Sequence, residues 1–371
     1  MKHLTTLLAV FVAVKTYLVA LALAVPKQYD TSSTLLFPGN RFLSRLVIWD
    51  SVFFVSSAER SHLYEHEWAF SWAWSRVLGL AGSREAIAYC AIAVSSLSHL
   101  LAAVMLRKLT ESVFKNKRFA ETTALMYVLS PAGIFLVAGY TESLFALFSF
   151  TGLYLRQKGQ YPLAGAVLGA SCLLRGNGLL WGIPFLFDLA STIKHNQFNK
   201  GVSVVVGGTL VGLCFLYTQY LPWSIFCPER GEWCNYYLPS IYGYVQDKYW
   251  NVGFLRYWTP NNIPNFLFAA PVLYLMYQSM SPDPKLYSFY AVHAIVGLAC
   301  LFVWHVQIVT RISTCLPTLY WYMAKLAQGY NGEYVVRYVF VWITFQVVMW
   351  GHIFPRRSQS GAEGIWLTYR A

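Results

Sequence analysis

The sequence predicts an all-α membrane protein whose helices cross the bilayer many times, and two properties of its composition predict this class. Hydrophobic residues fill 57% of the 371 positions and only 12% are charged, against roughly 25% charged in an ordinary soluble domain. The mean hydropathy of +0.44 points the same way. Polytopic helical membrane proteins are the common class with these values. We therefore expect a single multi-pass membrane domain over residues 1–371.

The apolar runs predict about 11 crossings, at residues 4–25, 84–106, 119–138, 141–156, 161–176, 178–191, 201–221, 263–280, 286–304, 309–327 and 335–353. Several of the middle runs are shorter than the roughly 20 residues that a straight crossing needs. Chain-breaking residues separate them, at Ser130-Pro131, Gly139 and 175–178. Because broken backbone at membrane depth must be buried or hydrated, we expect these segments to meet inside the protein around a cavity.

The first apolar run has two interpretations. Ala22-Leu23-Ala24 resembles a signal-peptide cleavage site. The run from Leu4 to Val25 is longer than a typical signal core, however, and Lys15 interrupts it. We expect a retained first helix.

The net charge of +12 comes from short basic tracts between apolar runs, at 107–118, 156–158 and 194–200. The positive-inside rule assigns such tracts to the cytosol. Nucleic-acid-binding proteins gather Lys and Arg on polar faces instead, so no nucleic-acid partner is expected. An odd number of crossings then gives a cytosolic N-terminus. The loops 26–83 and 222–262, and the C-terminal tail, are expected on the luminal side.

Neither long loop has the composition of a flexible linker. The first contains Trp68, Phe70, Trp72 and Trp74 among charged residues, a mixture that suits an amphipathic helix at the membrane interface. The second, 222–262, is dense in Tyr and Trp. These side chains are favoured at the headgroup level and also stack on sugar faces.

Two of the seven cysteines, Cys227 and Cys234, bracket a polar segment of the second loop. A disulfide between them is expected if this loop is luminal, because that compartment is oxidising.

Acidic residues are concentrated in residues 41–70, which contain Asp50, Glu59, Glu65 and Glu67. Ionised side chains near a bilayer cost energy, so they tend to mark chemistry or a polar path. On the residues alone, Asp50 is either a helix cap, an ion-pair partner of Arg45, or a catalytic carboxylate.

Several passages, in order over most of the chain, resemble the second mannosyltransferases of glycosylphosphatidylinositol (GPI) anchor assembly, a family of the GT-C glycosyltransferase superfamily. They read IWDSVFF (48–54), AER (58–60), EHEWAF (65–70), SPAGIFLVAGYTESLFAL (130–147), RGNG (175–178), CPERGEWC (227–234), VQDKYWNVGFLRYW (245–258), NFLFAAPVLY (265–274) and HVQIVTR (305–311). The chain departs from the family at Ser61-His62, Ser71-Trp72 and Trp304, which puts contacts at the loop edge in doubt more than the class.

The resemblance implies a GT-C-like helix bundle in the endoplasmic reticulum membrane with a luminal active site. The enzyme would transfer mannose from dolichyl-phosphate mannose and form an α1,6 bond to the first mannose of the GPI precursor. Its partners would be these two lipids and the bilayer, and an accessory membrane subunit is left open.

Two alternatives remain at this stage. One is another dolichyl-phosphate-sugar transferase of the GT-C type. The other is a transporter or lipid scramblase, because broken helices with Glu142 and Arg175 near mid-membrane are compatible with one. The long aromatic loops and the absence of visible paired halves argue against the transporter.

The implied reaction predicts a particular set of catalytic groups. A β-linked donor and an α-linked product require inversion, so a carboxylate must accept the proton of the attacking hydroxyl. Asp50 is the candidate base, and the adjacent Trp49 is expected to bind substrate. Arg311 is the first candidate for the donor phosphate, because its fork of donors matches phosphate bidentately. Arg175 is the second, with Glu142 as its partner.

The remaining candidates would bind substrate. Glu65 and Glu67 are expected at the glucosamine amine or sugar hydroxyls of the acceptor, and His305 and Gln307 lie near Arg311 in the sequence. Asn177 would orient a sugar hydroxyl or satisfy broken helix backbone. No cofactor is expected to be required; Glu65-His66-Glu67 keeps a divalent metal as the less favoured alternative.

Overall fold

The computed structural model describes residues 2–25, 32–227, 229, 231–330 and 332–352. Every regular element in these ranges is a helix, so the predicted all-α class is confirmed. The parts of the predictions that concern residues 26–31 and the tail after residue 352 lie outside the described residues. In chain order the elements are α1 (Lys2–Ala24), α2 (Ser32–Leu36), α3 (Arg41–Leu46), α4 (Asp50–Arg60), η1 (Glu65–Ala69), α5 (Trp72–Gly79), α6 (Arg84–Phe114), α7 (Lys117–Val128), η2 (Gly133–Leu136), α8 (Glu142–Gln157), α9 (Tyr161–Leu174), η3 (Gly176–Trp181), α10 (Gly182–Lys194), α11 (Phe198–Phe226), η4 (Glu232–Asn235), α12 (Ile241–Trp250), η5 (Pro260–Asn262), α13 (Ile263–Gln278), η6 (Pro284–Leu286), α14 (Tyr287–Phe302), η7 (Val306–Ile308), α15 (Val309–Ile312), η8 (Ser313–Cys315), α16 (Pro317–Ala327) and α17 (Gly332–His352).

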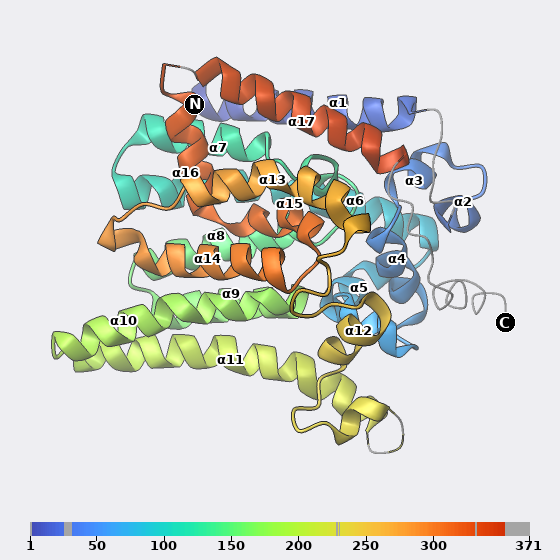
Figure 1. Cartoon of the computed structure of the whole chain (residues 1–371). Helices are drawn as coiled ribbons and strands as arrows, with labels where there is room; N and C mark the ends of the chain where they lie inside the picture. The colour runs from blue at the N-terminus through green and yellow to red at the C-terminus, as the bar shows by residue number, and fades with distance from the viewer. Residues whose placement is uncertain (1, 26–31, 228, 230, 331, 353–371) are drawn as a thin grey trace.

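The long helices lie side by side along one direction, as a bundle with two distinct ends (Figure 1). The turns that carry the basic tracts, at 107–118, 156–158 and 194–200, lie at the end where α1 begins, which we call the basic end. There His3 of α1 pairs with Glu121 of α7 at 3.0 Å. The helices α2 to α5 and α12 cover the opposite end, the site end. This grouping of basic residues is the one expected from the positive-inside rule, while the compartment that each end faces stays a prediction.

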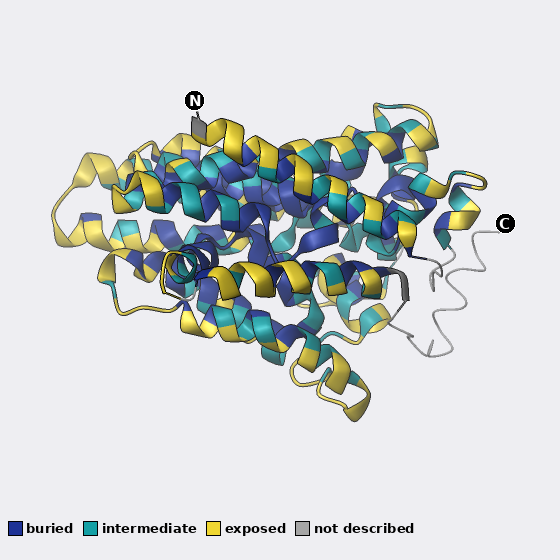
Figure 2. Ribbon diagram, turned by 90° about the horizontal axis from the view of Figure 1, so that it is seen from above, coloured by how far each residue is buried: buried dark blue, intermediate teal, exposed yellow. Residues whose placement is uncertain are grey.

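Four helices are long and apolar enough to cross a membrane by length and composition: His3–Ala24, Arg84–Phe114, Phe198–Phe226 and Pro284–Phe302. Most of the other apolar runs form shorter helices, while the last run forms the 21-residue helix α17. The count of 11 crossings therefore stays a prediction. Buried residues lie inside the bundle and exposed residues lie on its outer faces (Figure 2). On α11 the exposed residues include large apolar ones, as expected for a surface in contact with lipid: Val205, Leu213, Leu216 and Tyr220.

The chain is broken between α7 and α8, and side chains from distant helices satisfy the backbone of this break. The carbonyl of Pro131 accepts hydrogen bonds from the indole of Trp342 at 3.1 Å and the amide of Gln346 at 3.0 Å, both on α17. A buried carbonyl without a partner costs roughly 1–3 kcal/mol. These bonds therefore allow the helix to stop inside an apolar bundle.

A second carbonyl of the break, that of Leu136, is satisfied by the first helix. Lys15 donates to it at 2.5 Å, and Ser95 of α6 donates to it at 3.3 Å. Leu7 and Leu18 of α1 are buried in the same core. The lysine that interrupts the first apolar run thus has a structural partner, and α1 packs in the bundle. Retention of this helix stays a prediction.

The expectation of an interfacial amphipathic helix is wrong for Trp74. Residues 65–79 instead form η1 and α5, and Trp74 is fully buried with its indole donating to the carbonyl of Gly139 at 3.3 Å. A tryptophan buries a large apolar area and needs one acceptor. The bend at Gly139, where φ is +75°, supplies that acceptor, so the side chain packs inward.

Helices α9 and α11 approach each other closely through glycines. A Cβ added to Gly165 would overlap the backbone of Gly207 on the facing helix. Small residues of this kind let transmembrane helices pack backbone to backbone. This contact fixes α11 against α9, whose C-terminal end leads into the functional site.

We predict that Gly165→Val destabilises the protein by roughly 2 kcal/mol, because the added side chain forces the two helices apart. The midpoint of thermal unfolding in detergent measures this effect. Gly212→Val is the matched control, since a Cβ at Gly212 meets no atom within 4 Å. Equal midpoints for the two variants would contradict the packing described here.

Candidate functional site

Asp50 is the first residue of α4, and the chain enters this helix through a strained turn. Trp49 has φ 58° and ψ −129°, a conformation that costs little for glycine and on the order of 1–3 kcal/mol for a bulky residue. Two hydrogen bonds hold the turn: Tyr140 donates to the carbonyl of Ile48 at 2.9 Å, and Ser51 donates to a carbonyl of the α7–α8 break at 2.9 Å. The backbone of Asp50 is therefore fixed relative to that break.

Asp50 is one end of a chain of four charged side chains. Its Oδ2 lies 2.7 Å from Nη1 of Arg311. The Nε of Arg311 lies 2.6 Å from Oε1 of Glu142, and Nη1 of Arg175 lies 2.8 Å from the same oxygen. The pairing of Arg175 with Glu142 was expected from the sequence. Arg311 joins that pair to Asp50, a connection that the sequence did not indicate. The ion-pair partner of Asp50 is therefore Arg311 and not Arg45.

Each of these residues lies at an interruption or an end of a helix. Glu142 is the first residue of α8, and Arg175 links α9 to η3. Arg311 belongs to the four-residue helix α15, between two 3-10 turns. The short and interrupted segments expected from the sequence thus meet at this point, and they carry the charges with them.

Two aromatic rings hold the guanidinium of Arg311. Its carbon lies 5.0 Å from the ring centroid of Phe135 and 4.8 Å from that of Tyr140, within the range of cation–π attraction. Both residues flank the Gly139 bend, and nothing in their spacing alone indicated this role. The rings and Glu142 together fix the position of Arg311.

Exposure differs sharply along the chain of charges. The side chain of Glu142 is 0% exposed, those of Arg311 and Arg175 are 14% and 17% exposed, and that of Asp50 is 35% exposed. The formal charges of the four groups sum to zero. Glu142 Oε2 has no hydrogen-bond partner among the described residues. Asp50 is therefore the member of the cluster that a substrate can reach most easily.

The other predicted binding residues differ in how far their side chains are already bonded within the protein. His305 bonds through Nε2 to the carbonyl of Trp250 at 2.8 Å and stacks on Tyr257 at 4.4 Å, so it ties α12 to η7. Gln307 has its Oε1 buried with no hydrogen-bond partner among the described residues. Asn177 is half-buried in η3, two residues after Arg175.

Glu67 supports the loop itself. Its side chain is fully buried, pairs with Arg60 at 2.5 Å and accepts hydrogen bonds from the backbone N–H of Leu63 at 2.8 Å and of Tyr64 at 3.1 Å. A carboxylate with this many donors is satisfied. The structure leaves it no face for the acceptor contact that we expected from the sequence.

Glu65 joins the two long loops. Its Oε1 accepts a hydrogen bond from the indole of Trp233 at 2.9 Å. Trp233 is fully buried in a small apolar cluster with neighbours from α11 and α12. Cys227 and Cys234 form a disulfide on either side of it, with their Cα atoms 5.7 Å apart. The second loop is thus a compact unit that packs on the first long loop, 26–83, which we call the acidic loop. This hydrogen bond and the contact of Trp68 with Phe226 join the two loops, a link that the sequence did not reveal.

Burial disfavours the charged form of the two histidines near Glu65 and Glu67. Burial lowers the pKa of His62 to about 4 and also lowers the pKa of His66. Glu65 and Glu67 bond different partners, so Glu65-His66-Glu67 does not converge as a ligand set. In the part of the chain that the structure describes, no three His, Cys, Asp or Glu side chains are placed to hold a metal ion. The need for a metal or cofactor stays a prediction.

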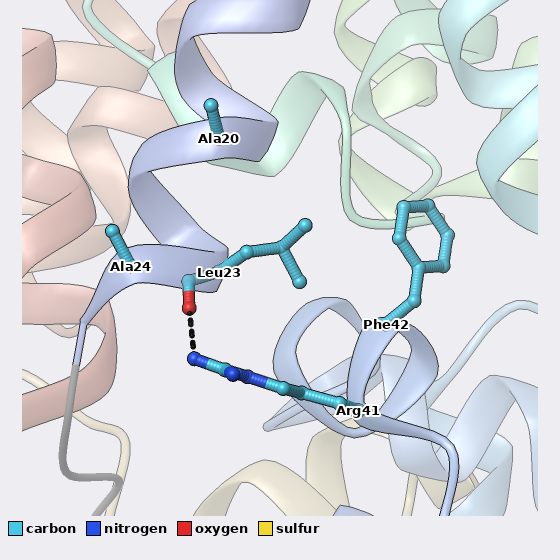
Figure 3. Close-up of a pocket in the computed structure, with 5 residues that line it drawn as sticks. All are labelled: Ala20, Leu23, Ala24, Arg41 and Phe42. Atoms are coloured by element: carbon cyan, nitrogen blue, oxygen red, sulfur yellow. Dashed lines mark hydrogen bonds between the residues drawn. The ribbon is translucent and has the colours of Figure 1, made fainter.

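A surface groove of about 490 Å³ lies between the end of α1 and the start of α3. Ala20, Leu23 and Ala24 line one side, and Arg41 and Phe42 the other (Figure 3). Arg41 donates to the carbonyl of Leu23 at 2.8 Å. The groove is apolar apart from this guanidinium, and it contains none of the four charges described above.

The comparisons with known proteins point to one family. The family model described as mannosyltransferase (PIG-V) matches residues 1–282 and 279–351. The protein called GPI mannosyltransferase 2 in Yarrowia lipolytica is 88% identical over 96% of this chain and 99% of its own length. Its namesake in Schizosaccharomyces pombe is 38% identical over 82% of this chain and 71% of its own length.

A similarity among solved structures is weaker. The crystal structure of the oligosaccharyltransferase of Archaeoglobus fulgidus overlaps with a TM-score of 0.45 and 13% identity, covering 98% of this chain and 57% of that one. The family model and the curated relatives, by contrast, cover nearly all of the present sequence. The chain belongs to the PIG-V mannosyltransferase family, the membrane glycosyltransferases of GPI-anchor biosynthesis.

Proposed function

We propose that this chain transfers mannose from dolichyl-phosphate mannose to the first mannose of the GPI precursor in α1,6 linkage, at the luminal face of the endoplasmic reticulum membrane. The observation that carries the proposal is the partly exposed carboxylate of Asp50 paired with Arg311, which shares the buried carboxylate of Glu142 with Arg175. An inverting transfer from a lipid phosphate needs both a base and cations for the phosphate.

Asp50 is the general base in this mechanism. It accepts the proton from the 6-hydroxyl of the acceptor mannose while that oxygen attacks C1 of the donor sugar. The bond from C1 to the phosphate oxygen breaks on the opposite face, and its electron pair leaves with dolichyl phosphate. One displacement inverts the anomeric carbon, so no covalent intermediate on the protein is needed.

Arg311 binds the phosphate. Arg175 shares the carboxylate of Glu142 with Arg311 and adds a second positive charge close to the site. The phosphate gains negative charge as the glycosidic bond breaks, so a fixed guanidinium stabilises the transition state more than the bound donor. The rings of Phe135 and Tyr140 and the buried Glu142 keep this guanidinium in place before the reaction begins. Such preorganisation is the usual source of electrostatic catalysis.

Two features support the luminal assignment of the site end. The disulfide between Cys227 and Cys234 belongs to that end of the bundle, and disulfides persist in oxidising compartments. The basic tracts lie at the opposite end, which suits the cytosolic side.

We predict that Asp50→Asn lowers transfer by at least about 10²-fold, because asparagine keeps the shape of the side chain but accepts no proton. The assay uses membranes with dolichyl-phosphate mannose and a one-mannose GPI precursor, and it scores the two-mannose product. Glu59→Gln is the matched control, since Glu59 pairs with Arg84 at a partly exposed position. Near-normal turnover of a folded Asp50→Asn enzyme would remove Asp50 from the mechanism.

Arg311→Lys tests the phosphate contact. Lysine keeps the charge but loses the bidentate fork, so we expect kcat to fall and the KM for the donor lipid to rise, with a loss in kcat/KM on the order of 10-fold to 10²-fold. Arg84→Lys is the control substitution. A change in the KM of the acceptor alone would place the phosphate elsewhere, with Arg175 as the next residue to test.

Topology is tested with single cysteines and a membrane-impermeant thiol reagent. In sealed microsomes we expect Lys117→Cys, in a basic tract, to be labelled and Leu63→Cys, in the acidic loop, to be protected until detergent is added. Leu63 is 57% exposed, so protection reflects the membrane and not burial in the protein. The reverse pattern would place Asp50 in the cytosol and contradict the luminal mechanism.

A further inference from the structure

The same guanidinium serves as the partner of the candidate base and as the candidate phosphate ligand. Arg311 donates through Nε to Glu142 and through Nη1 to Asp50. Glu142 therefore occupies the edge of the guanidinium that contains Nε. The edge formed by Nη1 and Nη2 is the one that can grip a phosphate bidentately. Asp50 already contacts that edge.

We propose that the donor phosphate displaces Asp50 from Arg311, so that binding of the donor lipid releases the base for catalysis. This inference rests on the proposed function and adds an order of events to it. Two anions cannot share one edge of a guanidinium without repelling each other. The phosphate and Asp50 are therefore competitors for Arg311.

The charges of the cluster decide which carboxylate gives way. Asp50, Glu142, Arg175 and Arg311 balance one another, and the phosphodiester of the donor adds one negative charge. Glu142 is fully buried and holds both arginines. Removing a partner from a buried ion pair is strongly destabilising, because it leaves an uncompensated buried charge. Asp50 has a single arginine partner and is 35% exposed, so its carboxylate can turn to water at far lower cost.

Because the turn before α4 is held in place, the release of Asp50 from Arg311 involves only the Asp50 side chain. The backbone at Trp49 and Asp50 is fixed to the α7–α8 break by the bonds of Tyr140 and Ser51. Release of Asp50 is therefore a side-chain rotation at the start of α4 and does not require the helix to move. The base stays within the site and becomes free to accept the proton of the acceptor hydroxyl.

The exchange gives the enzyme a preference for binding its donor first. Before the donor binds, Arg311 competes with the acceptor hydroxyl for the Asp50 carboxylate. After it binds, the phosphate occupies the guanidinium and the carboxylate is available. Glu142 acts as a positioning residue in both states, because it keeps Arg311 in place while its other partner changes.

The test measures binding of dolichyl phosphate, which has the phosphate of the donor but no sugar to transfer, to the full-length protein in lipid nanodiscs. Removing a competing anion should strengthen binding, so we expect Asp50→Asn to lower the Kd by about fivefold or more, the equivalent of a partly exposed ion pair. The same variant loses transfer activity. Glu59→Gln, which removes an acid of the same loop that is paired with Arg84, should leave the Kd unchanged.

A double variant makes the test specific to Arg311. If the gain arises at this guanidinium, Asp50→Asn should give a much smaller tightening in an Arg311→Gln background, which lacks the cation for which the two anions compete. An unchanged or higher Kd in Asp50→Asn would overturn the exchange and leave the transferase assignment intact. Absence of dolichyl phosphate binding to the unmodified protein would overturn the donor assignment and the exchange with it. Thermal unfolding of each variant identifies any that fail to fold.

Discussion

The buried carboxylate of Glu142 is the constraint on which the rest of the structure depends. A charge removed from water is tolerated only when cations and hydrogen bonds compensate it, and here Arg311 and Arg175 do so. Both arginines must reach one point inside an apolar bundle. The helices α7–α8, α9–α10 and α14–α16 are each interrupted there. The helix interruptions therefore bring the two arginines to Glu142, and the ion pairs stabilise the interrupted segments.

Interrupted helices impose a second requirement, since their free carbonyls must find donors. Lys15 from α1 and Gln346 from α17 bond the same break from the two ends of the sequence, and Trp74 bonds it from the acidic loop. These contacts hold α1 and α17 against the centre of the bundle. Polar residues within the apolar runs thus serve as hydrogen-bond donors to the break. Because the turn before Asp50 is bonded to the same break, these contacts also keep that turn in a fixed position.

The sequence predicted the fold class, while the roles of the site residues stay predictions, and physical reasons limited what could be read of their contacts. The resemblance to a known family selected Asp50, the geometry of a guanidinium toward phosphate selected Arg311, and charges between short helices suggested the pair of Glu142 with Arg175. The bond of Asp50 to Arg311 joins residues 261 positions apart, which no periodicity encodes. Glu67 was predicted to bind substrate because the sequence does not distinguish a buried structural carboxylate from an exposed one. The fixing of Arg311 by aromatic rings was equally hidden, because aromatic residues are abundant throughout.

The distribution of the four charges along the chain has a consequence for biosynthesis. Asp50 and Glu142 emerge from the ribosome first, Arg175 follows, and Arg311 comes only near the end. Until the segment with Arg311 inserts, the membrane holds a nascent bundle in which Glu142 has one of its two cations and Asp50 has none. The energetic gain of closing the cluster is realised only on completion of the chain. A truncated product that lacks α15 keeps most of its apolar helices but leaves Asp50 without its arginine partner and Glu142 with one of its two cations.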